Sequence, residues 1–179
     1  MAIVALVGAA GAAGVAAQAG TSDAVKRGEY LVRIGGCHDC HTPLKMGPKG
    51  PEPDTARMLS GHPSDLKMPP APGPTGPWAW HGAASLTAFA GPWGVSYAIN
   101  LTSDATGLRN WTEEMFVRAM RTGQHAGNGR PILPPMPWQS LNAMTDSDLK
   151  AVFAYLKTVP PVHNIVPAAQ VATPPTASR

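Results

Sequence analysis

Apolar residues recur with helical spacing in three separate stretches of the chain, and these stretches predict its main helices. They lie within residues 23–36, 110–123 and 145–160. The third pattern is the clearest, because its apolar residues fall at positions i, i+3, i+4 and i+7: Leu149, Val152, Phe153 and Leu156. Each stretch therefore predicts a helix with one apolar face.

Residues that favour helix ends flank these stretches. Asp23, Thr112 and Thr145 are the predicted N-caps, since a short polar side chain can accept a hydrogen bond from an N–H of the first turn. Gly36 and Gly123 are the predicted stops, because glycine readily adopts the left-handed conformation that ends many helices.

Between the first two helices the chain is too rich in proline to be helical. Ten of the 35 residues from Pro43 to Pro77 are proline. Each one removes a backbone donor and disfavours the helical conformation of the residue before it. We expect an extended loop inserted in a single domain. Trp78, Trp80 and Trp93 follow this loop and predict that it covers an apolar surface.

The two ends of the chain predict segments outside the domain. The first 20 residues carry no charged side chain and contain a small-x-small pattern, Ala17-Gln18-Ala19. This is typical of a signal peptide, so we predict cleavage after Ala19 and a periplasmic protein, with an uncleaved anchor as the alternative. The predicted organisation is a signal peptide at 1–19, a domain at 20–161 with a Pro-rich insertion at 43–77, and a flexible tail at 162–179.

The chain has two cysteines, Cys37 and Cys40, and His41 follows them directly. C-x-x-C-H is the pattern for covalent attachment of a c-type haem. Two intervening residues match the separation of two vinyl groups on one porphyrin edge, and the adjacent imidazole can be the proximal iron ligand. A zinc site would need further paired ligands, and a thioredoxin-like pair would need a βαβ context with a helix beginning at the first cysteine. We therefore predict one covalently attached haem c.

Net charge and composition exclude one class of partner. The net charge is +3, 44% of the residues are apolar, and no run of Lys and Arg occurs. A nucleic-acid-binding protein typically carries such a basic cluster. We expect protein partners and no nucleic acid.

The second iron ligand is predicted at Met136. This residue lies in Pro134-Pro135-Met136-Pro137-Trp138, where the prolines stiffen the backbone and so reduce the entropy lost on ligation. A thioether favours the ferrous state and suits electron transfer. The alternative is a bis-histidine haem, in which His62 or His81 reaches the iron from the long loop.

Several further segments, taken with the haem motif, resemble class I c-type cytochromes. They are similar to the monohaem cytochrome c domains associated with periplasmic dehydrogenases. The matching segments are Arg27 to Leu31, Gly36 to Pro43, Gly91 to Gly94, Asn100 to Thr102, Trp111 to Glu114, and Pro134 to Asp146.

The resemblance implies an all-α cytochrome c fold, with three main helices around one haem and long Pro/Gly-rich loops. It implies that Gly28 and Tyr155 meet where the first and last helices cross. It assigns Cys37 and Cys40 to the vinyl groups and His41 to the iron, with Met136 opposite.

The implied function is single-electron transfer between a dehydrogenase and a downstream cytochrome or terminal oxidase. Such a protein is an electron carrier and not itself an enzyme. Related dehydrogenase subunits often join several haem domains, whereas this sequence has one motif. One alternative is a haem-bearing small subunit of a membrane-associated dehydrogenase complex. Another is haem catalysis or gas binding, which would require an open iron position.

Overall fold

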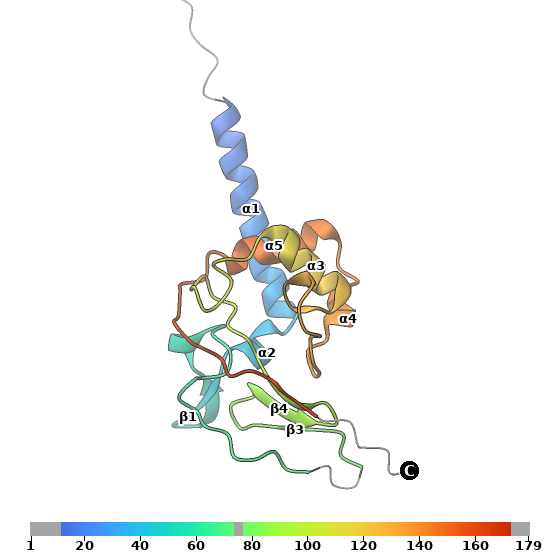
Figure 1. The fold of residues 1–179 in the computed structure, drawn as a ribbon. Coiled ribbons are helices and arrows are strands. Elements are labelled where there is room, and N and C mark those ends of the chain that lie inside the picture. The colour runs from blue at the N-terminus through green and yellow to red at the C-terminus, as the bar shows by residue number, and fades with distance from the viewer. Residues whose placement is uncertain (1–11, 74–76, 173–179) are drawn as a thin grey trace, which may run out of the picture.

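The computed structural model describes residues 12–73 and 77–172, with side chains described from residue 23. The helices are α1 (Ala12–Ile34), α2 (Cys37–His41), α3 (Glu113–Thr122), α4 (Trp138–Leu141) and α5 (Asp146–Leu156), with 3₁₀ turns at Thr55–Arg57 and His125–Gly127. The strands are β1 (Leu44–Gly47), β2 (Gly50–Pro53), β3 (His81–Gly82), β4 (Ala88–Gly91), β5 (Gly94–Tyr97) and β6 (Gln170–Val171). Figure 1 shows α5 across the second half of α1, α3 beside α5, and the strands at the other end of the molecule.

The predicted N-caps of the second and third helices and the predicted stop of the second are confirmed. The Thr112 hydroxyl accepts a hydrogen bond from the N–H of Met115 at 3.2 Å, and Gly123 ends α3 with φ of 67°. The Thr145 hydroxyl caps α5 by accepting from the N–H of Asp148 at 3.1 Å. These local interactions satisfy amide groups that the helix itself leaves free.

The predicted start of the first helix is wrong. Asp23 is not an N-cap, because α1 begins at Ala12 and continues without a break to Ile34. Five of the eleven residues from 12 to 22 are alanine, which has the highest helix propensity, so the helix extends past the residue expected to begin it. The predicted signal peptide lies partly outside the described residues, and the described part from Ala12 belongs to α1.

Helices α1 and α5 cross in direct backbone contact at Gly28, as the resemblance implied. A Cβ atom placed on Gly28 would lie 1.9 Å from the carbonyl oxygen of Ala151 and 2.8 Å from Cβ of Tyr155. Only a residue without a side chain fits there. Arg27 adds an exposed ion pair beside the crossing, with its Nε 2.9 Å from the carboxylate of Asp148.

The core joins the inner faces of α1, α3 and α5. Phe116 of α3 and Phe153 of α5 pack with their ring centroids 5.4 Å apart. The cluster of buried side chains includes Leu31, Val32, Leu59, Leu101, Leu108, Phe116, Ala119, Met120, Leu149, Val152, Phe153, Leu156 and Val159. The apolar stripe predicted on the last helix is therefore a core face.

The prediction of an all-α fold is wrong. The described part of the chain contains a two-stranded sheet, β1-β2, and a four-stranded sheet of order β3-β4-β5-β6, in which all neighbours are antiparallel. The strands are two to four residues long, too short for an alternating pattern to stand out. In β4 the residues Ala88, Phe89 and Ala90 are all buried, so alternation is absent even where the strand is longest.

The β1-β2 hairpin forms within the Pro-rich insertion because its prolines avoid the hydrogen-bonded positions. The N–H of Asp54 donates to the carbonyl of Pro43 at 2.8 Å, one step outside the ladder. Hydrogen-bonded and non-bonded pairs alternate in an antiparallel ladder. Pro53, opposite Leu44, and Pro51, opposite Met46, therefore occupy non-bonded positions, where no strand N–H is needed.

The first part of the predicted tail packs against the domain. The Asn164 side chain is buried and donates to the carbonyls of Ser60 at 2.7 Å and His62 at 2.9 Å. Further on, β6 extends the four-stranded sheet beside β5. Residues 173–179 lie outside the described residues.

None of the described helices is both long enough and apolar enough to cross a membrane.

We expect Gly28→Ala to destabilise the fold by about 3 kcal/mol, because the new methyl group must push α1 and α5 apart at a backbone contact. Chemical denaturation of the haem-loaded protein measures this loss. Gly73→Ala is the control, since no described atom apart from those of Gly73 and its chain neighbours lies within 4 Å of the added carbon. It should change the free energy of unfolding by less than about 0.5 kcal/mol. Equal stability of the two variants would contradict the close crossing.

Candidate functional site

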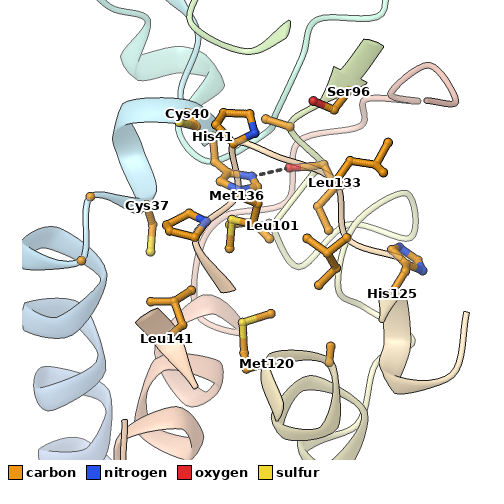
Figure 2. A pocket seen from close by; sticks show the side chains of 18 of the residues that line it. Cys37, Cys40, His41, Ser96, Leu101, Met120, His125, Leu133, Met136 and Leu141 are labelled. Atoms are coloured by element: carbon orange, nitrogen blue, oxygen red, sulfur yellow. Dashed lines mark hydrogen bonds between the residues drawn. The ribbon is translucent and has the colours of Figure 1, made fainter. Parts of the chain in front are cut away.

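A largely apolar cavity of about 400 Å³ lies between the helices and the four-stranded sheet. All four predicted site residues line it: Cys37, Cys40, His41 and Met136 (Figure 2). Protein interiors are otherwise packed with few voids larger than a water molecule, and this volume is in the range of small-molecule and cofactor sites. The fold therefore holds a cofactor-sized apolar chamber with its sulfur and nitrogen atoms at the wall.

The two cysteines belong to the short helix α2, which begins where α1 has ended. Gly36 turns the chain between them in the left-handed conformation, with φ of 67°. Residues at i and i+3 share one side of a helix, so Cys37 and Cys40 both reach the cavity. The sequence argument that no helix begins at the first cysteine is thus wrong.

The thiols nevertheless differ from those of an activated redox pair. Burial raises the pKa of Cys37 to about 11, and burial followed by the charge of Asp39 raises the pKa of Cys40. Reactive C-x-x-C pairs lower the thiol pKa in order to expose a thiolate. Both thiols are free of a disulfide and neutral at neutral pH.

The His41 side chain has one nitrogen satisfied and the other available. Its Nδ1 lies 2.8 Å from the carbonyl oxygen of Ile99, to which it donates (dashed in Figure 2). Burial lowers the pKa of His41, so the ring is neutral and Nε2 keeps a lone pair. A histidine that ligates a metal commonly has this arrangement, with the remote N–H bonded to a carbonyl.

The segment around residue 60 is hydrogen-bonded to the end of α2. The N–H of Gly61 donates to the carbonyl of His41 at 2.8 Å. The hydroxyl of Thr42 accepts from the N–H of Leu59 at 3.0 Å and lies 3.0 Å from Nδ1 of His38. Leu59 is fully buried with φ of 58°, a conformation that a side chain adopts only where its surroundings enforce it.

Met136 enters the cavity from the loop that precedes α4. Its backbone carbonyl accepts from the N–H of Trp138 at 3.0 Å. The Trp138 ring lies against Gly123, where an added Cβ would be 2.4 Å from the indole. Two further methionines, Met120 and Met144, also line the cavity, which the sequence did not predict.

The two histidines considered as alternative ligands do not line the cavity. His62 is fully buried, with Nδ1 2.9 Å from the hydroxyl of Thr87 and Nε2 3.1 Å from the carbonyl of Leu66. Both of its nitrogens are used, so it is a structural histidine. His81 lies in β3, opposite Ala90.

A group of residues that the sequence analysis did not select lies at the end of the cavity away from the cysteines. Figure 2 places Cys37 and His125 on opposite sides of the cavity. His125 packs edge-on against Trp111 with ring centroids 5.0 Å apart, and burial, then the charge of Arg130, lowers its pKa. Trp111, His125 and Arg130 also line a second cavity of about 320 Å³. No spacing rule links these residues, which lie together only in the fold.

The sheet supplies an aromatic wall. Trp80 and Phe89 contact edge-to-face with centroids 5.7 Å apart, and both line the cavity together with Tyr97. The loop itself does not cover this surface as the tryptophans predicted: its residues 64–73 are exposed, as is Trp78, and of the three tryptophans after the loop only Trp80 reaches the cavity.

Comparison with known proteins finds relatives that are cytochrome subunits. The chain is 32% identical over 147 residues to the gluconate 2-dehydrogenase cytochrome c subunit of Pantoea cypripedii, a match that covers 82% of this chain and 24% of that protein. It is 38% identical over 153 residues to the fructose dehydrogenase cytochrome subunit of Gluconobacter japonicus, covering 84% of this chain and 24% of that protein.

A further relative, the cytochrome c subunit of a quinone alcohol dehydrogenase from Gluconobacter oxydans, is 27% identical over 154 residues, covering 86% of this chain and 24% of that protein. The chain thus spans about a quarter of the length of these relatives. No protein-family model matches it. The predicted resemblance to the cytochrome c domains that accompany dehydrogenases is confirmed.

We expect Arg121→Ala to loosen the wall of the cavity between α4 and α5. Arg121, on α3, donates to the carbonyl of Asn142, to the carbonyl of Met144 at 2.8 Å and to the carboxylate of Asp146 at 2.6 Å. Losing these bonds from a partly exposed side chain should cost about 1–2 kcal/mol of unfolding free energy.

Arg109→Ala removes the same charge and is the control, because the Arg109 side chain makes no hydrogen bond or ion pair with the described residues. Thermal and chemical denaturation of both variants measures the difference. An equal loss in the two variants would mean that Arg121 contributes only its charge.

Proposed function

We propose that this chain, which is similar over most of its length to cytochrome c subunits of dehydrogenases, binds one haem covalently in the 400 Å³ cavity and transfers single electrons. The observation that carries the proposal is the convergence of four donors on one apolar chamber. Cys37, Cys40 and His41 come from α2, and Met136 comes from a loop 95 positions beyond His41 (136 − 41).

The donor set fits a c-type haem. The neutral thiols of Cys37 and Cys40 are those that would bond the two vinyl groups. Nε2 of His41 and the thioether of Met136 would be the iron ligands. His125, which Figure 2 shows opposite Cys37, and Arg130, whose carbonyl accepts from the N–H of His125 at 2.9 Å, would face the anionic propionates.

When bound, the haem iron would supply reversible one-electron chemistry. The surrounding residues would hold the two iron ligands in place and so restrict the iron to electron transfer. His41 is held through Ile99, and Met136 lies in a loop stiffened by prolines, so both ligands are fixed in advance. Two protein ligands leave no position for a substrate, and this favours a carrier over a catalyst. The apolar lining and the thioether both favour the less charged ferrous form.

The names of the relatives support a dehydrogenase as the electron donor, and we place the chain in the periplasm between that enzyme and a cytochrome or terminal oxidase. The last turns of α1, next to the cavity-lining residues Leu31 and Gly35, carry exposed Tyr30 and Ile34, at 53% and 62% exposure. A small exposed apolar surface suits the limited interface of a transient redox complex. Whether the chain acts as a separate carrier or as a subunit is tested by co-purification from the native host.

Mass spectrometry of the protein produced with a haem-attachment system should show one haem bonded to each chain. Cys37→Ser and Cys40→Ser should each lose one of the two thioether bonds, and the double variant should retain no haem after denaturation. Covalent haem on the double variant, or a second haem on the wild type, would contradict the proposal.

We expect Met136→Ala to keep the covalent haem and lose the sixth ligand. The weak red absorption band of thioether-ligated ferric iron should disappear, the reduction potential should fall, and imidazole should bind readily. Met144→Ala is the matched control, because Met144 lines the same cavity and should keep the band. Loss of the band in Met144→Ala but not in Met136→Ala would assign the ligand to Met144.

A further inference from the structure

The loop that carries Met136 has few hydrogen bonds of its own. Pro134, Pro135 and Pro137 have no N–H. Directly before the loop, the N–H of Ile132 donates a hydrogen bond to the carbonyl of Gly123 at 2.7 Å. At the end of the loop, the carbonyls of Met136 and Pro137 accept hydrogen bonds only from amides of α4. Within the described part of the chain, one hydrogen bond joins residues 133–137 to a distant segment.

That bond comes from the sheet. The hydroxyl of Ser96, in β5, donates to the carbonyl of Pro134 at 2.6 Å. Ser96 is buried and itself lines the cavity. A hydroxyl has a single proton to donate, and the other acceptor within reach, the carbonyl of Phe89, is at 3.5 Å. The short distance to Pro134 identifies it as the acceptor.

The direction of that proton is set by a tryptophan. The indole N–H of Trp93 donates to the Ser96 oxygen at 3.3 Å, which uses one of its lone pairs. The Trp93 ring lies over Gly91, where an added Cβ would be 2.6 Å from the ring. Gly91 pairs with Gly94 across the turn between β4 and β5. This turn is the Gly91-Pro92-Trp93-Gly94 segment. Two successive hydrogen bonds, from Trp93 to Ser96 and from Ser96 to Pro134, therefore connect it to the methionine loop.

We propose that Ser96, oriented by Trp93, is a positioning residue that holds the Met136 loop at the distance at which its thioether ligates the haem iron. The inference rests on the proposed function of Met136. A thioether is a weak ligand whose binding depends on being held in place, and groups outside the ligand set commonly supply that restraint. The four-stranded sheet therefore anchors the ligand loop through one hydroxyl.

The test compares Ser96→Ala with wild type in the haem-loaded protein by following imidazole displacement of the thioether. Loss of one buried hydrogen bond should speed the displacement about five- to tenfold. The reduction potential should fall and the thioether band should melt at a lower temperature. Covalent haem should be unchanged. Ser85→Ala is the matched control, since Ser85 is a buried serine beside the same sheet whose hydroxyl bonds Thr87.

Two conservative variants separate the hydrogen bond from packing. Ser96→Thr keeps the hydroxyl, so imidazole should displace the thioether at the wild-type rate. Trp93→Phe keeps a ring over Gly91 but removes the N–H, and should produce a smaller change in the same direction. It also provides the measurement if Ser96→Ala does not fold.

The proposal would be overturned if Ser96→Ala and Trp93→Phe both kept the wild-type rate of imidazole displacement and the wild-type reduction potential. It would also be overturned if imidazole displaced the thioether equally fast in Ser96→Thr and in Ser96→Ala. A wild-type protein that carries covalent haem but lacks the thioether band would refute the Met136 assignment instead. The two failures are therefore distinguishable.

Discussion

The backbone contact between α1 and α5 at Gly28 is the constraint on which the rest of the structure depends. Because Gly28 has no side chain, the two helices meet at the carbonyl of Ala151 without an intervening layer of atoms. Helix α1 leads through Gly36 into α2, so the crossing fixes where Cys37, Cys40 and His41 lie. Helix α5 is joined through Arg121 to α3 and to the end of α4, so the same crossing fixes the wall that carries the methionine loop.

The second requirement is a chamber that the core does not fill. A core built only from the apolar faces of α1, α3 and α5 would pack to the usual density and close. Here the four-stranded sheet forms a separate wall, with Phe89, Ser96 and Tyr97 facing the cavity. Several buried polar groups behind the walls are satisfied, as in the bond from His41 to Ile99 and those from Asn164 to the carbonyls of Ser60 and His62. The walls can therefore remain rigid without filling the space between them.

Much of the helical structure could be predicted because its signals are local. Thr112, Gly123 and Thr145 act at the ends expected of them. The strands could not be predicted, because pairs of two to four residues depend on partners far away in the chain: β6 joins β5 across more than seventy positions. Asp23 shows a failure of a local signal. A good N-cap residue does not mark the start of a helix when the residues before it also favour a helix.

The sequence by itself determined which residues carry the proposed chemistry, because the spacing of Cys37, Cys40 and His41 is contained in five consecutive residues. It also selected Met136 from the prolines around it. Only the tertiary structure decided that Met136 shares a cavity with His41, whereas both ring nitrogens of His62 are hydrogen-bonded, one to Thr87 and the other to Leu66. The physical reason is that packing and long-range hydrogen bonds assign each side chain its neighbours, and those contacts leave no periodic mark along the chain.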